Sequence, residues 1–274
     1  MTRIERHLRR MSPATDRSST SSRRDSEPTL SVDRTAVVRQ RAAYGTIERV
    51  TSNPYSAWTV VVPAKAADRA KTRLSTAYGA WRPHVARAFA LDTIRAAGDC
   101  ARVDRVLVVT DDDALIRTLA GWPRVRTIRD PGDDLNAAVR TGAEHAPAGE
   151  RIAVVPADLP ALTGDELAAA LDRAGSHDRS VVPDGEGIGT TLLTARTPSQ
   201  LAPAYGPDSL RAHRVGGATV LDLAVPSSLR RDVDLPSHLT EAAHLGIGPS
   251  TRRVLARVHN REETGPTGDP VSSR

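Results

Sequence analysis

Three aspartates stand where their carboxylate oxygens could hold a divalent cation. Asp158 follows an apolar run in "VVPADLPAL", and Asp232 and Asp234 are separated by one residue in "RRDVDLP". Side chains alternate along an extended segment, so the carboxylates of Asp232 and Asp234 point to the same side. Two such groups repel each other unless a cation lies between them, and Mg²⁺ prefers carboxylate oxygens combined with substrate phosphates. An ordinary alternative stays open, in which Asp158 begins a turn and the other two pair with the preceding arginines.

The only two lysines of the chain, Lys65 and Lys71, lie in one segment, "VVPAKAADRAKTRLS" at residues 61–75. All other basic residues among the 38 are arginines, so the sequence uses ammonium groups in this one place. A lysine ammonium is a compact point charge that binds phosphate well. Together with the three aspartates, the two lysines favour a site for phosphate and metal over a chance arrangement of acids.

Two further segments are candidates for holding an anion. "DGEGIGTT" (184–191) is rich in glycine, which lets a backbone approach phosphate closely, although an ordinary turn explains it as well. "YGPDSLRAHR" (205–214) enters a helix at Asp208 or Ser209, and a helix N-terminus attracts anions, with simple capping as the alternative. Of the eight histidines, His213 alone lies near these candidates. The sequence contains no G-x-G-x-x-G, G-K-[ST] or G-x-S-x-G pattern, so dinucleotide, phosphate-loop and serine-hydrolase sites have no support.

Short apolar runs alternate with amphipathic stretches between these candidates. The pattern predicts strands at 58–62, 105–110, 125–130 and 151–156, and helices at 83–97, 111–121, 133–146 and 163–175. Asp133 or Asp134 and Thr163 are the expected helix caps. Such alternation indicates an α/β fold with a mostly parallel sheet covered by helices on both faces. Ligands of these sheets bind outside the carboxyl ends of the strands, so functional residues should directly follow the first, second and fourth runs.

Composition divides the chain into three parts. Residues 1–56 hold 11 arginines against 6 acids and lack periodicity, which predicts a disordered basic extension; 259–274 read as a second disordered tail. Residues 57–258 carry nearly balanced charge and form the predicted folded domain. One cysteine, Cys100, excludes an intrachain disulfide, and we expect it to be a packed residue. No apolar run is long enough for a membrane helix or a signal peptide, so we expect a cytoplasmic protein.

Six motifs occur in an order that resembles one known family. They are "PAKAADRAKTRL", "DDLNAAV", "PADLPAL", "GIGTTLL", "YGPDSLRAH" and "DVDLPSHL", and the resemblance that they carry covers roughly residues 57–256. In this order they are similar to the phosphoenolpyruvate/2-phospho-L-lactate guanylyltransferases of deazaflavin coenzyme F-420 biosynthesis. The resemblance implies a Rossmann-like, glycosyltransferase-A-like nucleotidyltransferase fold. It also implies transfer of GMP from GTP to the phosphate of a small three-carbon acid, with release of pyrophosphate.

The resemblance assigns roles to particular residues. It places acceptor binding on Thr190, Gly206 and Ser209, and Mg²⁺ binding on Asp158, Asp232 and Asp234. We expect Lys65, Lys71 and Arg73 to meet the triphosphate and Asn136 to contact the nucleotide. Mild departures from the family pattern are "GTT" in place of "GTN" or "GTG", "PADLP" in place of "GDLP", and Tyr205 where phenylalanine is usual.

Several functions stay open at this point. Phosphoenolpyruvate is the expected acceptor, with 2-phospho-L-lactate and 3-phosphoglycerate as alternatives. A related nucleotidyltransferase of molybdenum-cofactor type is a rival, although the first loop here lacks the glycine-rich pattern of those enzymes. The non-enzymatic rival is a polyanion binder that uses the basic N-terminal extension. Expected partners are GTP, the three-carbon acid and a downstream transferase that takes the unstable product, with no membrane and no specific nucleic acid.

Overall fold

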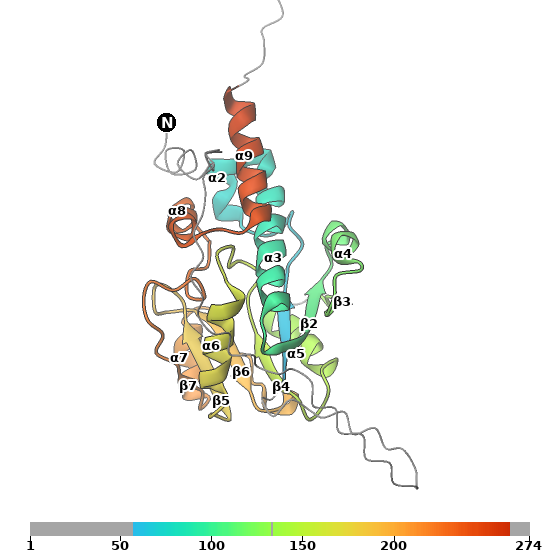
Figure 1. The fold of residues 1–274 in the computed structure, drawn as a ribbon, viewed down its shortest axis with the longest axis vertical. Helices are drawn as coiled ribbons and strands as arrows, with labels where there is room; N and C mark the ends of the chain where they lie inside the picture. The colour runs from blue at the N-terminus through green and yellow to red at the C-terminus, as the bar shows by residue number, and fades with distance from the viewer. Residues whose placement is uncertain (1–56, 133, 264–274) are drawn as a thin grey trace, which may run out of the picture. The chain divides into compact units, whose positions relative to one another are not determined.

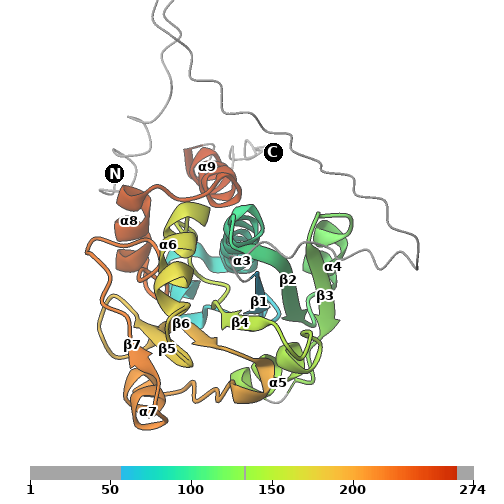
Figure 2. The ribbon, with the colours of Figure 1, turned by 60° about the horizontal axis from the view of Figure 1, so that its bottom comes forward.

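A mixed sheet of seven strands forms the centre of the computed structural model, which describes residues 57–132 and 134–263. Its spatial order is β3-β2-β1-β4-β6-β5-β7 (Figures 1 and 2). Neighbouring strands are parallel except where β6 pairs, because β6 is antiparallel to both β4 and β5. The mostly parallel α/β sheet predicted from the sequence is therefore confirmed. The strands are β1 (Trp58–Pro63), β2 (Val103–Thr110), β3 (Val125–Arg129), β4 (Arg151–Val154), β5 (Arg179–Pro183), β6 (Thr190–Ala195) and β7 (Thr219–Val220).

Helices cover both faces of this sheet (Figure 2). Short 3₁₀ turns, η1 (Thr72–Leu74), η2 (Gly79–Trp81) and η3 (Pro198–Gln200), connect several elements. The helices are α2 (Ser75–Tyr78), α3 (Arg82–Asp99), α4 (Asp113–Leu119), α5 (Leu135–Glu144), α6 (Gly164–Ala174), α7 (Ser209–Val215), α8 (Pro236–Leu245) and α9 (Pro249–Glu263). In the part of the chain that the structure describes, none of these helices has the length and apolar character needed to cross a bilayer.

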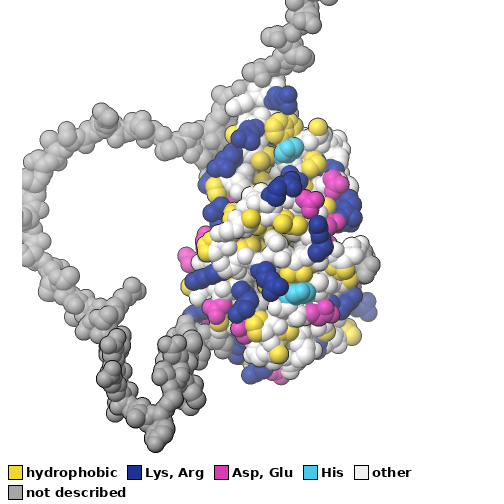
Figure 3. All heavy atoms as spheres, turned by 90° about the vertical axis from the view of Figure 1, so that its right-hand side faces the viewer, with side chains coloured by type: hydrophobic (Ala, Val, Ile, Leu, Met, Phe, Trp, Pro, Cys, Tyr) yellow, Lys and Arg dark blue, Asp and Glu magenta, His cyan; other side chains and the backbone are white. Residues whose placement is uncertain are grey.

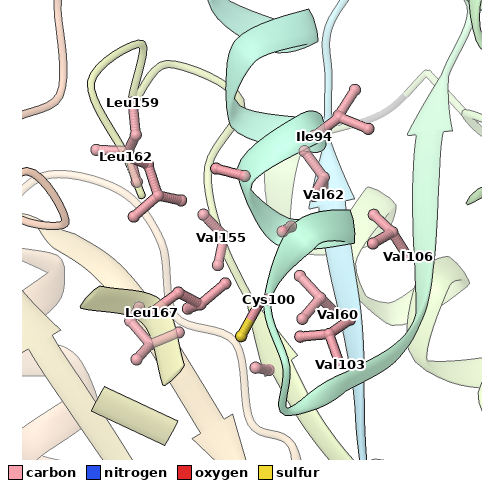
Figure 4. Packing of buried hydrophobic residues seen from close by; sticks show 14 of the residues in the cluster. Val60, Val62, Ile94, Cys100, Val103, Val106, Val155, Leu159, Leu162 and Leu167 are labelled. Carbon is pink, nitrogen blue, oxygen red and sulfur yellow. The ribbon is translucent and has the colours of Figure 1, made fainter. Parts of the chain in front are cut away.

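Alternation along β1 explains how both faces are buried. Val60 and Val62 belong to a core cluster with Ile94 of α3, whereas Val61 packs with Val139 of α5 on the opposite face. A strand buried on both sides reads as a continuous apolar run, which is why "WTVVV" could be recognised in the sequence. Figure 4 shows the first cluster from close by, and Cys100 lies inside it as the packed residue that we expected.

Three side-chain caps start the helices that follow the central strands. Asp112 accepts hydrogen bonds from two backbone N–H groups at the start of α4, Asp134 accepts one at α5, and Thr163 accepts one at α6. The caps predicted at Asp134 and Thr163 are confirmed, and Asp133 lies outside the described residues. Each cap fixes the residue at which its helix begins. The loop between the preceding strand and that helix therefore has a defined length.

Some elements were not predicted. The antiparallel pair β5 and β6 and the helices α8 and α9 all lie beyond residue 175, where the alternation is weaker. Helix α9 continues to Glu263 and so crosses the boundary expected at residue 258. The basic extension predicted for 1–56 and the remaining tail, 264–274, lie outside the described residues. On the face in Figure 3, basic and acidic side chains are interspersed, in keeping with the balanced charge of 57–258.

Candidate active site

The candidate site lies at the sheet edge where β1, β2 and β4 end. Residues 64–71, here called the lysine segment, follow β1; Asp111 and Asp112 follow β2; and Asp158 lies shortly after β4. The sequence predicted functional residues at these three places because the carboxyl ends of parallel strands meet at one edge. The structure puts chemically useful side chains at all three, but those after β2 serve mainly to hold the lysine segment.

Two acids after β2 fix the backbone of the lysine segment. Asp111 Oδ1 accepts a hydrogen bond from the N–H of Ala66, and Asp112 Oδ2 accepts one from the N–H of Ala67, each at 3.2 Å. Asp112 is buried and also receives Arg87 Nη2 at 2.9 Å. Burial opposes the charge of Asp112, but hydrogen bonds from the backbone and from Arg87 outweigh it and keep the pKa of this carboxyl below its usual value. The segment is therefore held by a carboxyl group whose charged form is favoured.

Arg82, at the start of α3, holds the lysine segment from its other side. Its guanidinium donates hydrogen bonds to the carbonyl oxygens of Ala67 at 3.2 Å, Asp68 at 2.6 Å and Ala70. Sequence analysis did not single out Arg82, because three carbonyl acceptors from one loop can be recognised only once the path of that loop is known. The "DDD" run after β2 was the one available signal for the acids on the opposite side.

Lys71, Asp158, Asp232 and Asp234 meet in what we call the carboxylate cluster. The three aspartates each offer an oxygen, and these oxygens all lie within 4.8 Å of one another. Lys71 Nζ is 2.5 Å from Asp158 Oδ2 and 2.5 Å from Asp234 Oδ1. The backbone explains the meeting, because the N–H of Val233 donates to the carbonyl oxygen of Asp158 at 3.0 Å and the Val233 side chain is buried. "DVD" is thereby held beside "PADLP".

The charges of this cluster oppose one another. Burial, followed by the charges of Asp158 and Asp234, raises the pKa of Asp232 to about 7. Burial works against the ammonium of Lys71, but the attraction of two carboxylates wins and raises its pKa. Burial likewise opposes the charge of Asp234, yet Lys71 and then Arg73 hold its pKa below the usual value. The site thus has more negative charge than its one lysine can offset.

Two carboxylate oxygens of the cluster are incompletely satisfied. Among the described residues, Asp158 Oδ1 and Asp232 Oδ1 are buried without a hydrogen-bond partner. A buried oxygen of this kind is costly unless something binds it. Three close carboxylates with two such oxygens match the hard ligands that a divalent cation of the Mg²⁺ type prefers. The residues present therefore fit the metal that the sequence implied.

A second acidic group includes Asp232, but its other two carboxylates already accept hydrogen bonds. Asp184, Glu186 and Asp232 also bring carboxylate oxygens within 4.8 Å of one another. Asp184, however, accepts hydrogen bonds from the N–H groups of residues 188–189 at 2.9 and 2.7 Å. Glu186 accepts one from Arg231 Nη1 at 2.6 Å. These bonds shape the glycine-rich loop, so the carboxylate cluster is the better candidate for holding a metal ion.

Thr190, Ser209 and His213 form a buried polar group that we call the hydroxyl–imidazole cluster. Ser209 Oγ donates to Thr190 Oγ1 at 3.1 Å, and the same oxygen lies 3.0 Å from His213 Nδ1. The backbone N–H of Ala204 donates to His213 Nε2 at 2.9 Å. The ring of Tyr205 meets that of His213 edge-on, with centroids 5.1 Å apart. Strand β6, helix α7 and the loop before it are thus joined around one imidazole.

The loop before α7 is held by Asn136. Its Nδ2 donates to the carbonyl oxygen of Tyr205 at 2.9 Å, and its Oδ1 accepts from the N–H of Tyr205 at 2.7 Å. Gly206 follows with a φ of 151°, which glycine adopts easily. The nucleotide contact predicted for Asn136 stays a prediction, whereas its two amide atoms have this positioning role. The Tyr205 hydroxyl is buried without a partner among the described residues, and burial, then the charge of Asp158, raises its pKa.

The structure separates the three cations expected to act together. Lys71 lies in the carboxylate cluster. Lys65 is exposed and lines, with Arg69, a cavity of about 280 Å³ between the end of β1 and the start of α5. Arg73 is exposed and acts on the cluster through its charge on Asp234. Their common contact with a triphosphate stays a prediction. Lys65 and Lys71 lie at different parts of the same sheet edge.

Comparison with known proteins identifies the family of this chain. A family model described as "Guanylyl transferase CofC like" matches residues 58–258. The phosphoenolpyruvate guanylyltransferase of Streptomyces coelicolor is 47% identical over 205 residues, which are 73% of this chain and 97% of that protein. That of Salinispora arenicola is 49% identical over 199 residues, covering 71% and 91%.

Among solved structures, a nucleotidyl transferase from Methanothermobacter thermautotroptrophicus aligns with a TM-score of 0.49 and 18% identity, covering 69% of this chain and 97% of that one. The family match is the stronger finding, because it takes in every strand of the sheet and both clusters. The chain therefore belongs to the CofC-like guanylyl transferase family.

Proposed function

We propose that this chain transfers GMP from GTP to phosphoenolpyruvate, forming enolpyruvoyl-2-diphospho-5'-guanosine and pyrophosphate in coenzyme F-420 biosynthesis. A phosphate oxygen of the acceptor bonds to the α-phosphorus of GTP while the bond from that phosphorus to the bridging oxygen of the β-phosphate breaks. The observation that carries the proposal is the carboxylate cluster at the end of β4, in a chain of the guanylyl transferase family. The names of the relatives supply the acceptor.

Asp158, Asp232 and Asp234 are the residues that would hold Mg²⁺. Bound there, the cation would neutralise phosphate charge and polarise the phosphoryl oxygens. Both substrates are anions, and bringing two such charges close in a partly dry cleft costs on the order of several kcal/mol per pair. A surplus of carboxylates would repel the anionic substrates, which supports a role in holding metal rather than in binding the substrates directly.

Lys71 offsets part of the carboxylate charge. Its ammonium could also contact a phosphate bound beside the carboxylate cluster. Lys65 and Arg69 place two further cations around the neighbouring cavity, although Arg69 also pairs with Asp111 and two acids, Asp130 and Asp134, line the same cavity. We assign the triphosphate to this stretch, with Arg73 at its exposed end. No side chain needs to act as a general base, because the attacking phosphate is already ionised.

Thr190, Gly206 and Ser209 are assigned to the acceptor acid. Support comes from their arrangement, since Thr190 and Ser209 share a hydrogen bond and Gly206 lies in the loop that Asn136 and His213 hold in place. All three belong to segments that meet around a single buried imidazole. A rigid group of neutral donors is suited to recognising a small anion whose charge is offset elsewhere.

The direct test is pyrophosphate release by the purified protein with GTP and Mg²⁺, run against phosphoenolpyruvate, 2-phospho-L-lactate and 3-phosphoglycerate. We expect release with phosphoenolpyruvate and much less with the other two. Release with another acceptor alone would correct the substrate, and a folded protein that binds no GTP would overturn the proposal. The downstream transferase should be tested as a partner by adding it to the same assay and following consumption of the product.

A further inference from the structure

His213 has a hydrogen-bond pattern that fixes the position of its proton. The side chain is 3% exposed and both ring nitrogens have partners. Nε2 lies 2.9 Å from the backbone nitrogen of Ala204, and a backbone N–H can only donate. Nε2 must therefore be the acceptor, so a neutral ring carries its proton on Nδ1. Burial, then the charge of Arg179, lowers the pKa of His213 to about 4, which keeps the ring neutral near pH 7.

The proton on Nδ1 determines what Thr190 can do. The Nδ1–H group donates to Thr190 Oγ1 at 3.0 Å, and Ser209 Oγ donates to the same oxygen at 3.1 Å. A hydroxyl oxygen has two acceptor sites and one hydrogen. With both acceptor sites occupied, the hydroxyl group has only its hydrogen left to offer. Thr190 is thus a hydrogen-bond donor and cannot act as an acceptor.

We propose that His213 is a positioning residue for the acceptor acid: through its Nδ1–H it commits the Thr190 hydroxyl to donate to the acceptor's carboxylate or phosphate. This inference rests on the proposed function, which places the acceptor at Thr190. The same ring also holds Ala204, two residues before Gly206, so one side chain sets both the threonine and the adjoining loop. A neutral donor suits this place, because a protonated ring would direct a second N–H at the backbone N–H of Ala204.

A bland alternative is that His213 only fills space and ties the loop to α7. Two amide variants separate these roles, because asparagine places its amide near the Nδ1 position and glutamine near the Nε2 position. His213→Asn keeps a donor for Thr190 and loses the bond to Ala204, whereas His213→Gln keeps an acceptor for Ala204 and loses the donor. If the donor matters, His213→Gln should be the worse variant for acceptor binding even though it retains the loop contact.

The experiment measures initial rates of pyrophosphate release with GTP and phosphoenolpyruvate varied separately. For His213→Gln we expect the KM for phosphoenolpyruvate to rise by about 10-fold to 100-fold, as for loss of a hydrogen bond to a charged group, with the KM for GTP within about 2-fold. For His213→Asn the KM for phosphoenolpyruvate should rise clearly less. His145→Gln, at an exposed histidine, is the matched control and should change neither KM. An effect on both substrates alike, or a worse result for His213→Asn, would overturn the inference.

Two further measurements keep the outcomes apart. Nitrogen-15 NMR of the wild-type imidazoles, with the His213 signal identified by its loss in a variant, should show the Nδ1–H tautomer. Finding the Nε2–H tautomer would overturn the inference without any assay, and this readout also covers variants that fail to fold. Thr190→Val should raise the KM for phosphoenolpyruvate similarly, and adding His213→Gln to it should raise it little further. Wild-type protein that releases no pyrophosphate would instead sink the proposed function.

Discussion

The carboxylate cluster and the hydroxyl–imidazole cluster lie at one edge of the sheet but differ in charge and in how fully their polar atoms are hydrogen-bonded. In the first, one lysine pairs with two of three aspartates, and two buried carboxylate oxygens lack partners among the described residues. In the second, the imidazole is neutral near pH 7, and the hydrogen bonds from Ala204, Ser209 and the His213 ring leave one hydrogen, that of the Thr190 hydroxyl, without an acceptor among the described residues. The first therefore leaves oxygens that a cation could bind, whereas the hydrogen bonds of the second are already formed without a ligand.

This difference follows from how each cluster is built. The carboxylate cluster joins two loops through one backbone hydrogen bond, from Val233 to Asp158, and its repulsion remains after folding. The hydroxyl–imidazole cluster joins the first residue of a strand to two residues one helical turn apart, Ser209 and His213. Charge that repels can change partners readily, while a satisfied neutral network resists rearrangement. We therefore expect variants of the two clusters to differ in stability, in pH dependence and in activity.

The largest expected effect is on turnover. Asp158→Asn removes a charge from the carboxylate cluster while keeping the size of the side chain, and should reduce kcat by about 100-fold or more, because metal-assisted stabilisation of the phosphates is lost. Pyrophosphate release at saturating Mg²⁺ measures it. The control is Asp113→Asn at an exposed ion pair with Arg129, which should leave kcat nearly unchanged. Near-normal turnover of Asp158→Asn would show that this carboxylate holds no catalytic metal.

The next effect distinguishes the two lysines by stability. Lys71→Met leaves Asp158 and Asp234 facing each other without their shared cation and should lower the free energy of unfolding by about 2–3 kcal/mol. Lys65→Met alters an exposed side chain and should change it by less than about 0.5 kcal/mol. Urea unfolding in the absence of divalent metal compares them. Equal effects would mean that the ion pairs of Lys71 add nothing to stability.

A smaller effect appears in the pH dependence of stability. Asp232 keeps its proton up to about pH 7 in the folded chain, against an ordinary value of 3.8. Between these values the folded state binds more protons than the unfolded state, so its stability falls as the pH rises. Asp232→Asn should remove this loss and raise the free energy of unfolding by about 2 kcal/mol at pH 8 without metal. Denaturant curves at pH 5 and 8 test it, and a variant less stable than wild type at pH 8 would contradict it.

Sequence analysis recovered the sheet because β1, β2 and β4 are buried on both faces and read as plain apolar runs. It singled out the three aspartates that the structure brings together because Asp232 and Asp234 alternate along an extended segment and because the motifs resemble a known family; their metal-binding role stays a prediction. It did not recover β5 and β6, since β6 runs antiparallel and follows a loop rich in glycine. The partners of Arg82 and Asn136 were equally inaccessible: Asn136 bonds a backbone 69 residues away, and no local pattern records a contact of that kind.

The smallest effect should have the opposite sign to that of Asp232. The folded pKa of His213 is about 4, below its ordinary 6.5, because burial and Arg179 disfavour the charged ring. Between these values the unfolded state binds more protons, so the stabilisation is complete above pH 6.5 and is lost as the pH falls through 4. The wild type should lose about 1–2 kcal/mol between pH 7 and 4.5 that His213→Gln does not lose. Parallel pH profiles for the two proteins would show that folding does not lower the pKa of the His213 ring. That result would also remove the contrast between the carboxylate cluster, which has excess negative charge, and the hydroxyl–imidazole cluster, which the fold keeps neutral.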